Sequence, residues 1–474
     1  MDSTIPSTFQ ALFLQFQPVF TTPSFQNFVA VMTGWMVCPG RHTISRVIQH
    51  ASGPARRKHH ATLYRFLSRA VWITDAVGQA LVALVLPILP GQRIFALVDD
   101  TLCRKSGPHL WGAAMHHDPL TSTYGRGTKV GRKVQFAYGH NWVVLSLWIP
   151  LPWNPQRGLA LPVLFRLYRS KKRCPKPEYR KRTELAREMI DLLASWIPES
   201  RTLTGVGDSE YACKTLVRSL PARIEFIGPL PMDAAFYDLP GFQTGRGRRA
   251  KKGKRLPSPK QLAEDPSVPW NLVTLPIYGR QVQAKVKTQI GLWYTVAGTR
   301  LGRMVLTRDP AGRIDDRAYF ATNPDLTIEE VTQGFSRRWA QEVLHRDTKQ
   351  ALGLKDPQNG WWRRPHGKRA TKKIPGPQPH ATRGSDAVHH TVPLAFVAYG
   401  LVVLWYLKHG SMQKDVRRVK LRAPWYRHKK EPSFADMLHA ARIELWTSRF
   451  SAHPLLRAVS SKIDRVLPPW LLAS

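Results

Sequence analysis

The segment RIFALVDDT, residues 93–101, is a short apolar run that ends in two carboxylates. It lies between Gly91 and Lys105, and this pattern predicts a buried β-strand with Asp99 and Asp100 at its end. Because side chains alternate along a strand, the two carboxylates are expected to point to opposite faces of the sheet. One of them is therefore a candidate for a site at the sheet edge.

Strand and helix patterns alternate in the sequence that follows this segment. Strands are predicted at 134–138, 142–148, 202–206 and 224–227, and helices at 184–196 and 213–220. Interleaved strands and helices predict an α/β fold with a mixed sheet. The strand at 202–206 runs into the sequence GDSEYA, which places Asp208 at a second strand end.

The character of the chain changes on both sides of this core. Residues 1–88 have apolar residues at helical spacing, and 234–322 are rich in strand patterns, including 281–287, 292–297, 303–306 and 318–321. A helix is predicted over 327–352, with Thr327 as its N-cap. The predicted divisions are a helical N-terminal DNA-binding domain (1–88), a first core part (89–233), a β-rich insertion (234–322), a second core part (323–362), a basic Pro/Gly-rich linker (363–385) and a helical C-terminal region (386–474).

The predicted helix FSRRWAQEVLHRDTKQALG, from Phe335, carries a third notable carboxylate, Glu342. At about 100° per residue, Arg338, Glu342 and Lys349 share one face of this helix. An exposed, ion-paired helix face is the simpler interpretation. The two strand-terminal aspartates favour a second interpretation, in which Asp99, Asp208 and Glu342 converge on one site. Three such carboxylates suit two Mg²⁺ ions about 3.5–4 Å apart, the arrangement that phosphodiester chemistry requires.

The charge of the chain points to a polyanionic partner. Its 71 Lys and Arg against 32 Asp and Glu give a net charge of +39. Nucleic acid is the favoured partner and an anionic membrane surface the lesser one. Two basic segments are predicted to contact phosphates, with a solvated charged loop as the alternative. Their candidates are Lys171, Lys172 and Arg173 in the first, and Arg246, Arg248, Arg249, Lys251 and Lys252 in the second.

Three further features of the sequence bear on partners and location. Trp361 and Trp362 precede two arginines and could stack on an unpaired base, although core packing of one of them is equally consistent. The apolar stretch 391–407 is short for a bilayer and contains Pro393 and Gly400, so a buried helix is expected. Four widely spaced cysteines show no zinc pattern and indicate a reducing compartment.

These motifs together resemble the DDE transposases of bacterial insertion sequences, in the branch with a strand-rich insertion before the glutamate. The likeness is carried by Asp99-x-Thr101, by GDSEYA around Asp208, and by the helix motif Tyr, two residues, Arg, three residues, Glu, six residues, Lys. Arg338, Glu342 and Lys349 match that motif, whereas Phe335 stands where tyrosine is usual. The Asp-x-Thr spacing favours Asp99 over Asp100 as the first ligand.

The resemblance implies an RNase H-like core that is dependent on Mg²⁺, with Mn²⁺ as a substitute. It also implies that Asp99, Asp208 and Glu342 coordinate metal, while Arg338 and Lys349 hold phosphates near the scissile bond. The implied activity is cutting and joining of mobile-element ends. The implied partners are double-stranded DNA with terminal inverted repeats, target DNA and a second copy of the chain, in the bacterial cytoplasm at the nucleoid and without a membrane.

Two other functions remain open from the sequence. One is an RNase H-like repair or junction nuclease, which would share the acidic site without needing specific transposon ends. The other is a non-catalytic DNA-binding protein derived from a transposase. The presence of all three acidic residues together with Arg338 and Lys349 favours an active enzyme.

Overall fold

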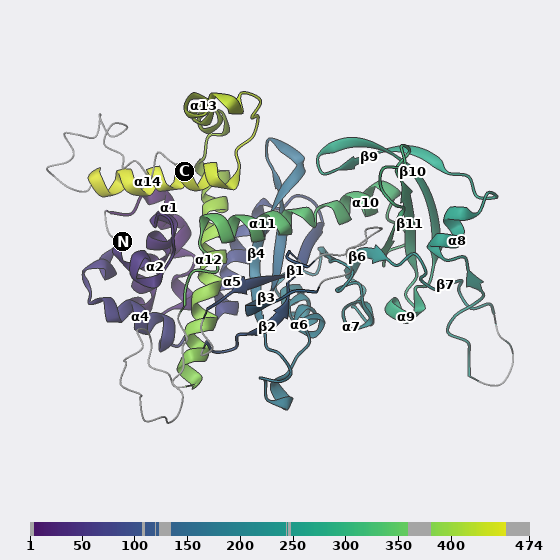
Figure 1. Cartoon of the computed structure of the whole chain (residues 1–474), viewed down its shortest axis with the longest axis horizontal. Coiled ribbons are helices and arrows are strands. Elements are labelled where there is room, and N and C mark those ends of the chain that lie inside the picture. The colour runs from purple at the N-terminus through teal and green to yellow at the C-terminus, as the bar shows by residue number, and fades with distance from the viewer. Residues whose placement is uncertain are drawn as a thin grey trace.

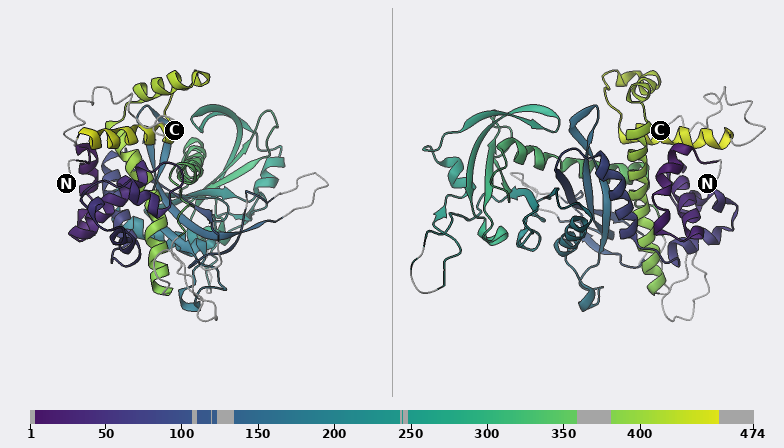
Figure 2. Two further views of the ribbon diagram at one scale, coloured as in Figure 1. Left: turned by 60° about the vertical axis from the view of Figure 1, so that its left-hand side comes forward. Right: turned by 180° about the vertical axis from the view of Figure 1, so that it is seen from behind.

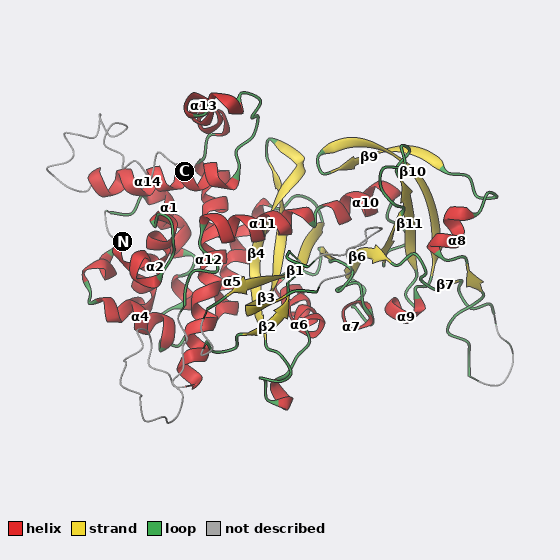
Figure 3. Cartoon of the chain, viewed as in Figure 1, coloured by secondary structure: helices red, strands yellow, loops and turns green. Residues whose placement is uncertain are grey.

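The computed structural model describes residues 4–106, 110–118, 120–122, 134–242, 244, 248–358 and 381–451. It is a mixed α/β structure in which a ten-stranded sheet has a helical body at one end (Figures 1 and 3). The predicted fold class is therefore confirmed. The strands farthest from the helical body belong to the predicted insertion (Figure 2).

The centre of the sheet has the strand order β4-β3-β1-β5-β6. Strands β1 (Arg93–Arg104), β3 (Phe136–Leu151) and β4 (Asn154–Tyr168) pair antiparallel, whereas β5 (Thr202–Val206) and β6 (Ile224–Leu230) run parallel to β1. Helix α6 (Arg182–Trp196) leads from β4 to β5, and α7 (Lys214–Val217) leads from β5 to β6. A short strand, β2 (Ala114–His117), pairs with the first residues of β3, just before the part of β3 that pairs with β4. This order is that of an RNase H-like core.

Strand β3 joins two stretches that the sequence predicted as separate strands. Gly139 lies within it, and a Cβ at this position would stand 2.2 Å from the carbonyl oxygen of Cys103 on β1. The glycine therefore marks a close approach of two backbones rather than a turn. The sequence interpretation missed β4, because its Pro- and Arg-containing start masks the strand pattern that follows.

The strands of the insertion extend the same sheet. β12 (Arg317–Ala321) pairs antiparallel with β6, and β11 (Gly302–Arg308), β10 (Arg280–Gly291) and β9 (Asn271–Ile277) continue outward from it. The remaining elements here are β7 (Phe236–Tyr237), β8 (Arg255–Leu256), α8 (Pro259–Glu264) and α9 (Tyr294–Ala297). The predicted strand at 292–297 is wrong, because α9 forms a single helical turn that Gly298 ends at φ 69°.

The helix predicted over 327–352 is two helices, α10 (Ile328–Ser336) and α11 (Trp339–Ala351). Thr327 is the N-cap of α10, as predicted: its side chain accepts from the backbone of Glu330 at 3.1 Å, and Glu330 accepts from the backbone of Thr327 at 2.8 Å. The break falls at Arg337 and Arg338. After this break α11 begins, and it packs against β1 and β4.

The two terminal regions form one helical body. The N-terminal helices are α1 (Ser7–Leu14), α2 (Thr22–Val37), α3 (Ile44–Gln49), α4 (His60–Ser68) and α5 (Thr74–Val85), and the C-terminal ones are α12 (Ala381–His409), α13 (Met412–Arg422) and α14 (Phe434–Ser451). Helix α12 packs against α1, α2 and α4 on one side and against α5 and β4 on the other, as Figure 1 shows.

Helix α12 contains the apolar stretch that raised a membrane span. By length and composition it could cross a bilayer, but 94% of its apolar window is buried inside the protein. Phe396 stacks on Phe165 of β4 at 5.2 Å, and Tyr399 stacks on Phe434 of α14 at 4.2 Å. The helix is therefore the centre of the core between the sheet and the helical body.

Candidate active site

Asp99 and Asp208 lie level with each other on neighbouring strands. The parallel register of β1 and β5 pairs Leu97 with Val206, so two residues farther on Asp99 stands beside Asp208. Adjacent strands are about 4.8 Å apart, which brings the two carboxylates to one point where the short strand β5 ends. Asp208 follows β5 as predicted, whereas Asp99 lies within β1, which runs on to Arg104 instead of ending at residue 101 because it keeps pairing with β3. The sheet order supplies the proximity of the two residues.

The loop after β5 orients Asp208. Its Oδ1 accepts from the backbone amides of Glu210 at 2.9 Å and Tyr211 at 3.3 Å. A Cβ on Gly207 would stand 2.7 Å from Tyr211 Cβ and 3.2 Å from Val98 Cγ1. Only glycine therefore lets this loop fold back tightly against β1 beside Asp99.

Asp99 is the more enclosed of the two aspartates. Its Oδ1 accepts from the backbone amide of Asp100 at 2.8 Å, and its Oδ2 lies 3.6 Å from Arg338 Nη1. Burial, then the charges of Asp100 and Asp208, raise the pKa of Asp99 to about 8, against the opposing effect of Arg338. Ionisation of the buried Asp99 carboxyl group beside Asp100 and Asp208 is therefore unfavourable unless a cation binds next to it.

Glu342 reaches the same place from the first turn of α11. Arg338 Nη2 donates to Glu342 Oε1 at 2.6 Å, so one guanidinium contacts both Glu342 and Asp99. Lys349 lies two turns farther along α11, half-buried, and makes no ion pair within the described ranges. The helix thus holds Arg338 among the carboxylates, whereas Lys349 lies farther along it, where its charge lowers the pKa of Asp118.

Asp100 points to the other face of the sheet, as strand alternation requires. Its Oδ2 accepts from Asn141 Nδ2 at 2.7 Å and from Arg182 Nη1 at 3.0 Å. Arg182, at the start of α6, also contacts Glu210 Oε1 through Nε at 2.7 Å. This geometry supports Asp99 rather than Asp100 as the residue that faces the glutamate helix.

Arg182 is a site-supporting residue that the sequence interpretation did not single out. It bridges Asp100, next to Asp99, and Glu210, two residues beyond Asp208. It therefore ties the two aspartate-bearing segments together from the side opposite α11. Residues 166–182 contain nine Lys and Arg, and nothing in the local sequence of Arg182 distinguishes it from the others.

The far end of α11 is fixed by contacts with distant parts of the chain. Trp35 Nε1 of α2 donates to the carbonyl of Leu352 at 2.9 Å, and buried Lys105, just after β1, donates to the carbonyls of Lys355 at 2.9 Å and Pro357 at 2.7 Å. Burial lowers the pKa of Lys105 to about 8. These contacts set the position of α11, and hence of Glu342, relative to β1.

Phe335, where the resemblance has tyrosine, lies at the end of α10. Its ring packs against Tyr319 of β12 with centroids 4.8 Å apart, and the Arg338 guanidinium lies 5.8 Å from it. The side chain therefore supports the neighbouring arginine by packing, and it carries no hydroxyl for a phosphate contact.

The predicted basic contacts are exposed but stand apart from these carboxylates. Lys171, Lys172 and Arg173 lie in the segment between β4 and α6, and Arg248, Arg249, Lys251 and Lys252 lie between β7 and β8. In Figures 1 and 2 both segments hang from the lower side of the molecule, whereas α11 runs along the upper half. Arg246, Trp361 and Trp362 lie outside the described residues.

The order and geometry of these elements agree with a comparison with known families. The family model described as DDE superfamily endonuclease matches residues 15–290, more than half of the chain. The chain belongs to the DDE superfamily endonucleases. The matched range contains Asp99 and Asp208, whereas Glu342 lies beyond it. A search of the curated proteins finds no match to this endonuclease.

Members of this superfamily are metal-dependent nucleases, and the donor chemistry of the site fits a divalent cation. Hard oxygen ligands would come from Asp99, Asp208 and Glu342, and the raised pKa of Asp99 reflects its burial first and then the nearby charges of Asp100 and Asp208. The Arg338 guanidinium stands between two of these carboxylates as a cation. Among the described residues, no three acidic, histidine or cysteine groups lie closely enough together to hold a metal ion, so these carboxylates would have to draw closer to bind one.

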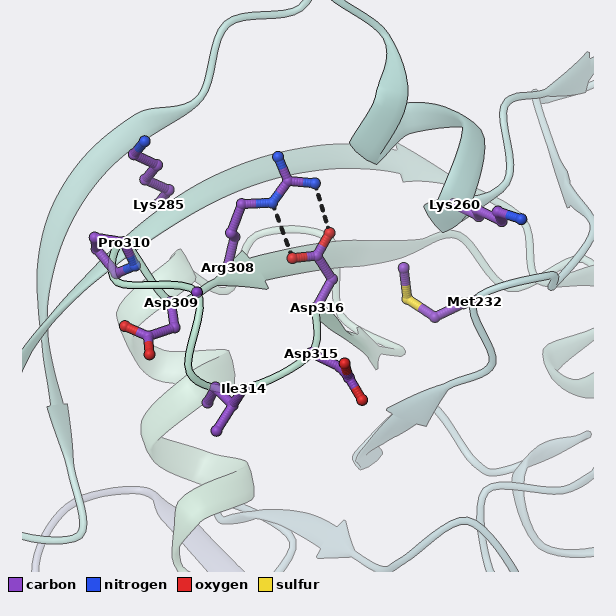
Figure 4. A pocket seen from close by; sticks show the side chains of 10 residues that line it. Met232, Lys260, Lys285, Arg308, Asp309, Pro310, Ile314, Asp315 and Asp316 are labelled. Atoms are coloured by element: carbon purple, nitrogen blue, oxygen red, sulfur yellow. Dashed lines mark hydrogen bonds and ion pairs between the residues drawn. The ribbon is translucent and has the colours of Figure 1, made fainter. Parts of the chain in front are cut away.

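A hollow of the endonuclease lies apart from these carboxylates, on the outer strands of the sheet. It has a volume of about 550 Å³ and is lined by Arg308, Asp309 and Asp316 among others (Figure 4). Arg308 pairs with Asp316 at 2.7 Å, and Asp309 pairs with Arg313 at 2.9 Å. Because these charges neutralise one another, this pocket does not compete with the carboxylates on β1, β5 and α11 as the catalytic site.

Proposed function

We propose that this protein is a DNA transposase that cuts and joins the ends of a mobile element. The observation that supports the proposal is the Arg338 guanidinium, which pairs with Glu342 and lies 3.6 Å from Asp99, the neighbour of Asp208 in the register of β1 and β5. The activity is metal-dependent hydrolysis of a phosphodiester bond, followed by attack of the freed 3′-hydroxyl on a second phosphodiester. The net charge of +39 supplies the long-range attraction for DNA.

The acidic residues of the site are proposed to bind metal, and the basic residues are proposed to bind phosphate. Asp99, Asp208 and Glu342 provide the carboxylate oxygens that would hold divalent metal, with Mg²⁺ as the physiological ion and Mn²⁺ as a substitute. When bound, two such ions supply activation of the attacking oxygen and stabilisation of the leaving one. Arg338 and Lys349 bind phosphate oxygens on either side of the scissile bond, the first as a planar fork and the second as a compact charge.

Arg338 has two roles in this proposal. Without DNA, its guanidinium pairs with Glu342 and lies near Asp99, which offsets part of their repulsion. With DNA bound, a phosphate would compete for the same guanidinium and draw it away from the carboxylates. Substrate binding and the release of carboxylate oxygens for metal would thus be coupled through one side chain.

The proposed partners follow from the reaction. They are double-stranded DNA with terminal inverted repeats, target DNA, and a second copy of the chain when two ends are brought together. The N-terminal helical region and the two exposed basic segments are the proposed sites of further phosphate contact. The proposed location is the bacterial cytoplasm, at the nucleoid.

The test is a reaction of the purified protein with DNA fragments that carry the sequences flanking its gene. Incubation with Mg²⁺ and a supercoiled target plasmid should yield cut ends and covalently joined products. Cleavage at specific ends without joining would favour a repair or junction nuclease. DNA binding without any Mg²⁺- or Mn²⁺-dependent cleavage would favour a non-catalytic derivative and contradict the proposal.

A further inference from the structure

Helix α13 and the turn that follows it carry an outward-facing row of cations. Residues 412–430, here called the α13 ridge, contain eight Lys and Arg against one carboxylate, Asp415. Lys414, Arg417, Lys420 and Lys430 are exposed and make no ion pair within the described part of the chain. In Figures 1 and 2 the helix stands out from the top of the molecule.

The single carboxylate of the α13 ridge is turned inward. Asp415 is buried, accepts from the hydroxyl of Tyr406 at 2.8 Å, and pairs with Arg418 at 3.0 Å. Val416 is also buried, so these two residues mark the face of α13 that packs on the protein. The opposite face presents Lys414, Arg417 and Leu421 at helical spacing without a compensating acid.

Aromatic side chains extend the exposed surface at the end of this helix. Trp425 is 75% exposed and Tyr426 is 55% exposed, both in the 3₁₀ turn Pro424–Tyr426. Arg427, His428 and Lys430 follow and are exposed, whereas Lys429 between them pairs with Asp436. Cations interleaved with exposed aromatic rings fit a nucleic-acid surface, where phosphates and the faces of sugars and bases alternate.

The α13 ridge is joined to the catalytic helix by a chain of contacts. Glu431, next to Lys430, accepts from Asn154 at 2.9 Å and pairs with Arg157 at 2.5 Å, both at the tip of the β3–β4 hairpin. A Cβ on Gly279 would stand 2.5 Å from Arg157 Cγ, so that hairpin touches the β9–β10 turn.

The β9–β10 turn in turn touches α11. Tyr278, beside Gly279, packs edge-on against Trp339 with centroids 6.0 Å apart. Trp339 is the first residue of α11 and the neighbour of Arg338. A continuous upper surface therefore runs from the start of the glutamate helix to the α13 ridge.

We propose that the α13 ridge binds the phosphate backbone of duplex DNA that extends away from the cleavage site. This inference takes its partner from the proposed function, but it concerns binding rather than catalysis. Lys414, Arg417 and Lys420 contact successive phosphates, and Trp425 packs against the sugar-phosphate surface beyond them. Each such contact releases counterions, so the ridge contributes to the salt dependence of DNA binding.

An anionic membrane is the other polyanion that a basic helix can bind. A helix that lies on a membrane places its apolar face toward the lipid. In α13 the apolar Val416 is buried against the protein, and the outward face of the helix has only Leu421 among its cations. The orientation of α13 therefore favours DNA.

The test compares two double variants that lose the same charge. Lys414→Gln with Lys420→Gln removes two cations of the α13 ridge, and Lys214→Gln with Lys285→Gln removes two exposed lysines elsewhere. Binding to a fluorescein-labelled DNA duplex is measured in EDTA over a series of NaCl concentrations, so no cleavage is involved. Thermal unfolding checks that both variants are folded.

We expect the ridge variant to bind duplex DNA about tenfold more weakly and to lower the slope of log K against log salt by about 2, whereas the control changes neither. Equal behaviour of the two variants would overturn the inference. So would binding of the wild type to phosphatidylserine vesicles that the ridge substitutions abolish while DNA binding is unchanged. Because the assay needs no metal, the ridge can be upheld even if the protein proves not to cleave DNA.

Discussion

Arg338 Nη2 donates to Glu342 Oε1 at 2.6 Å. Glu342 lies four residues, or about one helical turn, after Arg338. The same guanidinium lies 3.6 Å from Asp99 on β1. The cation that is proposed to hold a phosphate thus also restrains two of the three proposed metal ligands. Without DNA, the positive charge of Arg338 therefore already lies between the carboxylates of Asp99 and Glu342.

This relationship predicts opposite effects of Arg338→Ala on metal binding and on cleavage. Removing the guanidinium leaves Asp99 and Glu342 without their paired cation, so we expect Mn²⁺ to bind the DNA-free protein more tightly, by about tenfold. Cleavage should fall by about a hundredfold or more, because a phosphate contact is lost. Calorimetric titration with Mn²⁺ and a cleavage assay measure the two effects. Weaker Mn²⁺ binding in the variant would contradict the double role of Arg338.

The raised pKa of Asp99 leads us to expect that the stability of the metal-free protein depends on pH. Its pKa is raised to about 8 by burial and by the charges of Asp100 and Asp208, whereas an unfolded aspartate titrates near about 4. Between these values the folded protein binds a proton that the unfolded chain has lost, so the free energy of unfolding falls as pH rises. Below this window both states are protonated and the effect disappears.

The Asp99→Asn variant tests that dependence, because asparagine cannot become charged. In EDTA, the melting temperature of the variant should exceed that of the wild type by an amount that grows as pH rises through the window and levels off above about pH 8. A difference in melting temperature that stays constant with pH would show that the Asp99 carboxyl group is not shifted upward.

Gly207 is predicted to be essential for the position of Asp208. A methyl group there would stand 2.7 Å from Tyr211 Cβ, so Gly207→Ala should displace the loop that carries Asp208 and reduce cleavage by about tenfold or more. Gly241→Ala is a matched control, since its Cβ would meet nothing within 4 Å. DNA binding should be retained by both variants. Unimpaired cleavage by Gly207→Ala would show that this approach of β5 to β1 is not needed.

Arg182 is predicted to be a positioning residue. Replacing it by glutamine removes the bridge between Asp100 and Glu210, which lets the two aspartate-bearing segments move apart. We expect the Mg²⁺ concentration for half-maximal cleavage to rise about tenfold, with a smaller change in the rate at saturating Mg²⁺. Arg180→Gln, which affects a surface pair with Glu188, is the control. A loss of rate with unchanged Mg²⁺ dependence would refute the positioning role.

The parts of the fold that follow local periodicity could be predicted from the sequence. The strand β5 and the cap of α10 at Thr327 were found because apolar patterning and capping chemistry are local. The placement of Asp208 just after β5 also came from local pattern, whereas the predicted end of β1 near Asp99 is wrong because the strand continues to Arg104. Their adjacency depends on the order of β1 and β5 in the sheet, which no single segment encodes.

The features that were missed depend on distant partners. The role of Arg182 arises only when α6 packs beneath β1, and the contacts of Lys105 with residues 355 and 357 join parts of the chain 250 or more positions apart. The helix break at Arg337 and Arg338 carries neither Pro nor Gly, and Arg337 settles there against the rings of Phe95 and Trp148, at 3.7 and 4.2 Å. Such tertiary contacts override a continuous helical pattern.

The most direct test of the central claim is Mg²⁺-dependent cleavage of the flanking DNA by three single variants, Asp99→Asn, Asp208→Asn and Glu342→Gln. Each should lose cleavage while retaining DNA binding, and the exposed controls Asp191→Asn and Glu329→Gln should cleave like the wild type. Wild-type cleavage by any one of the three variants would contradict the assignment of Asp99, Asp208 and Glu342 as one catalytic site.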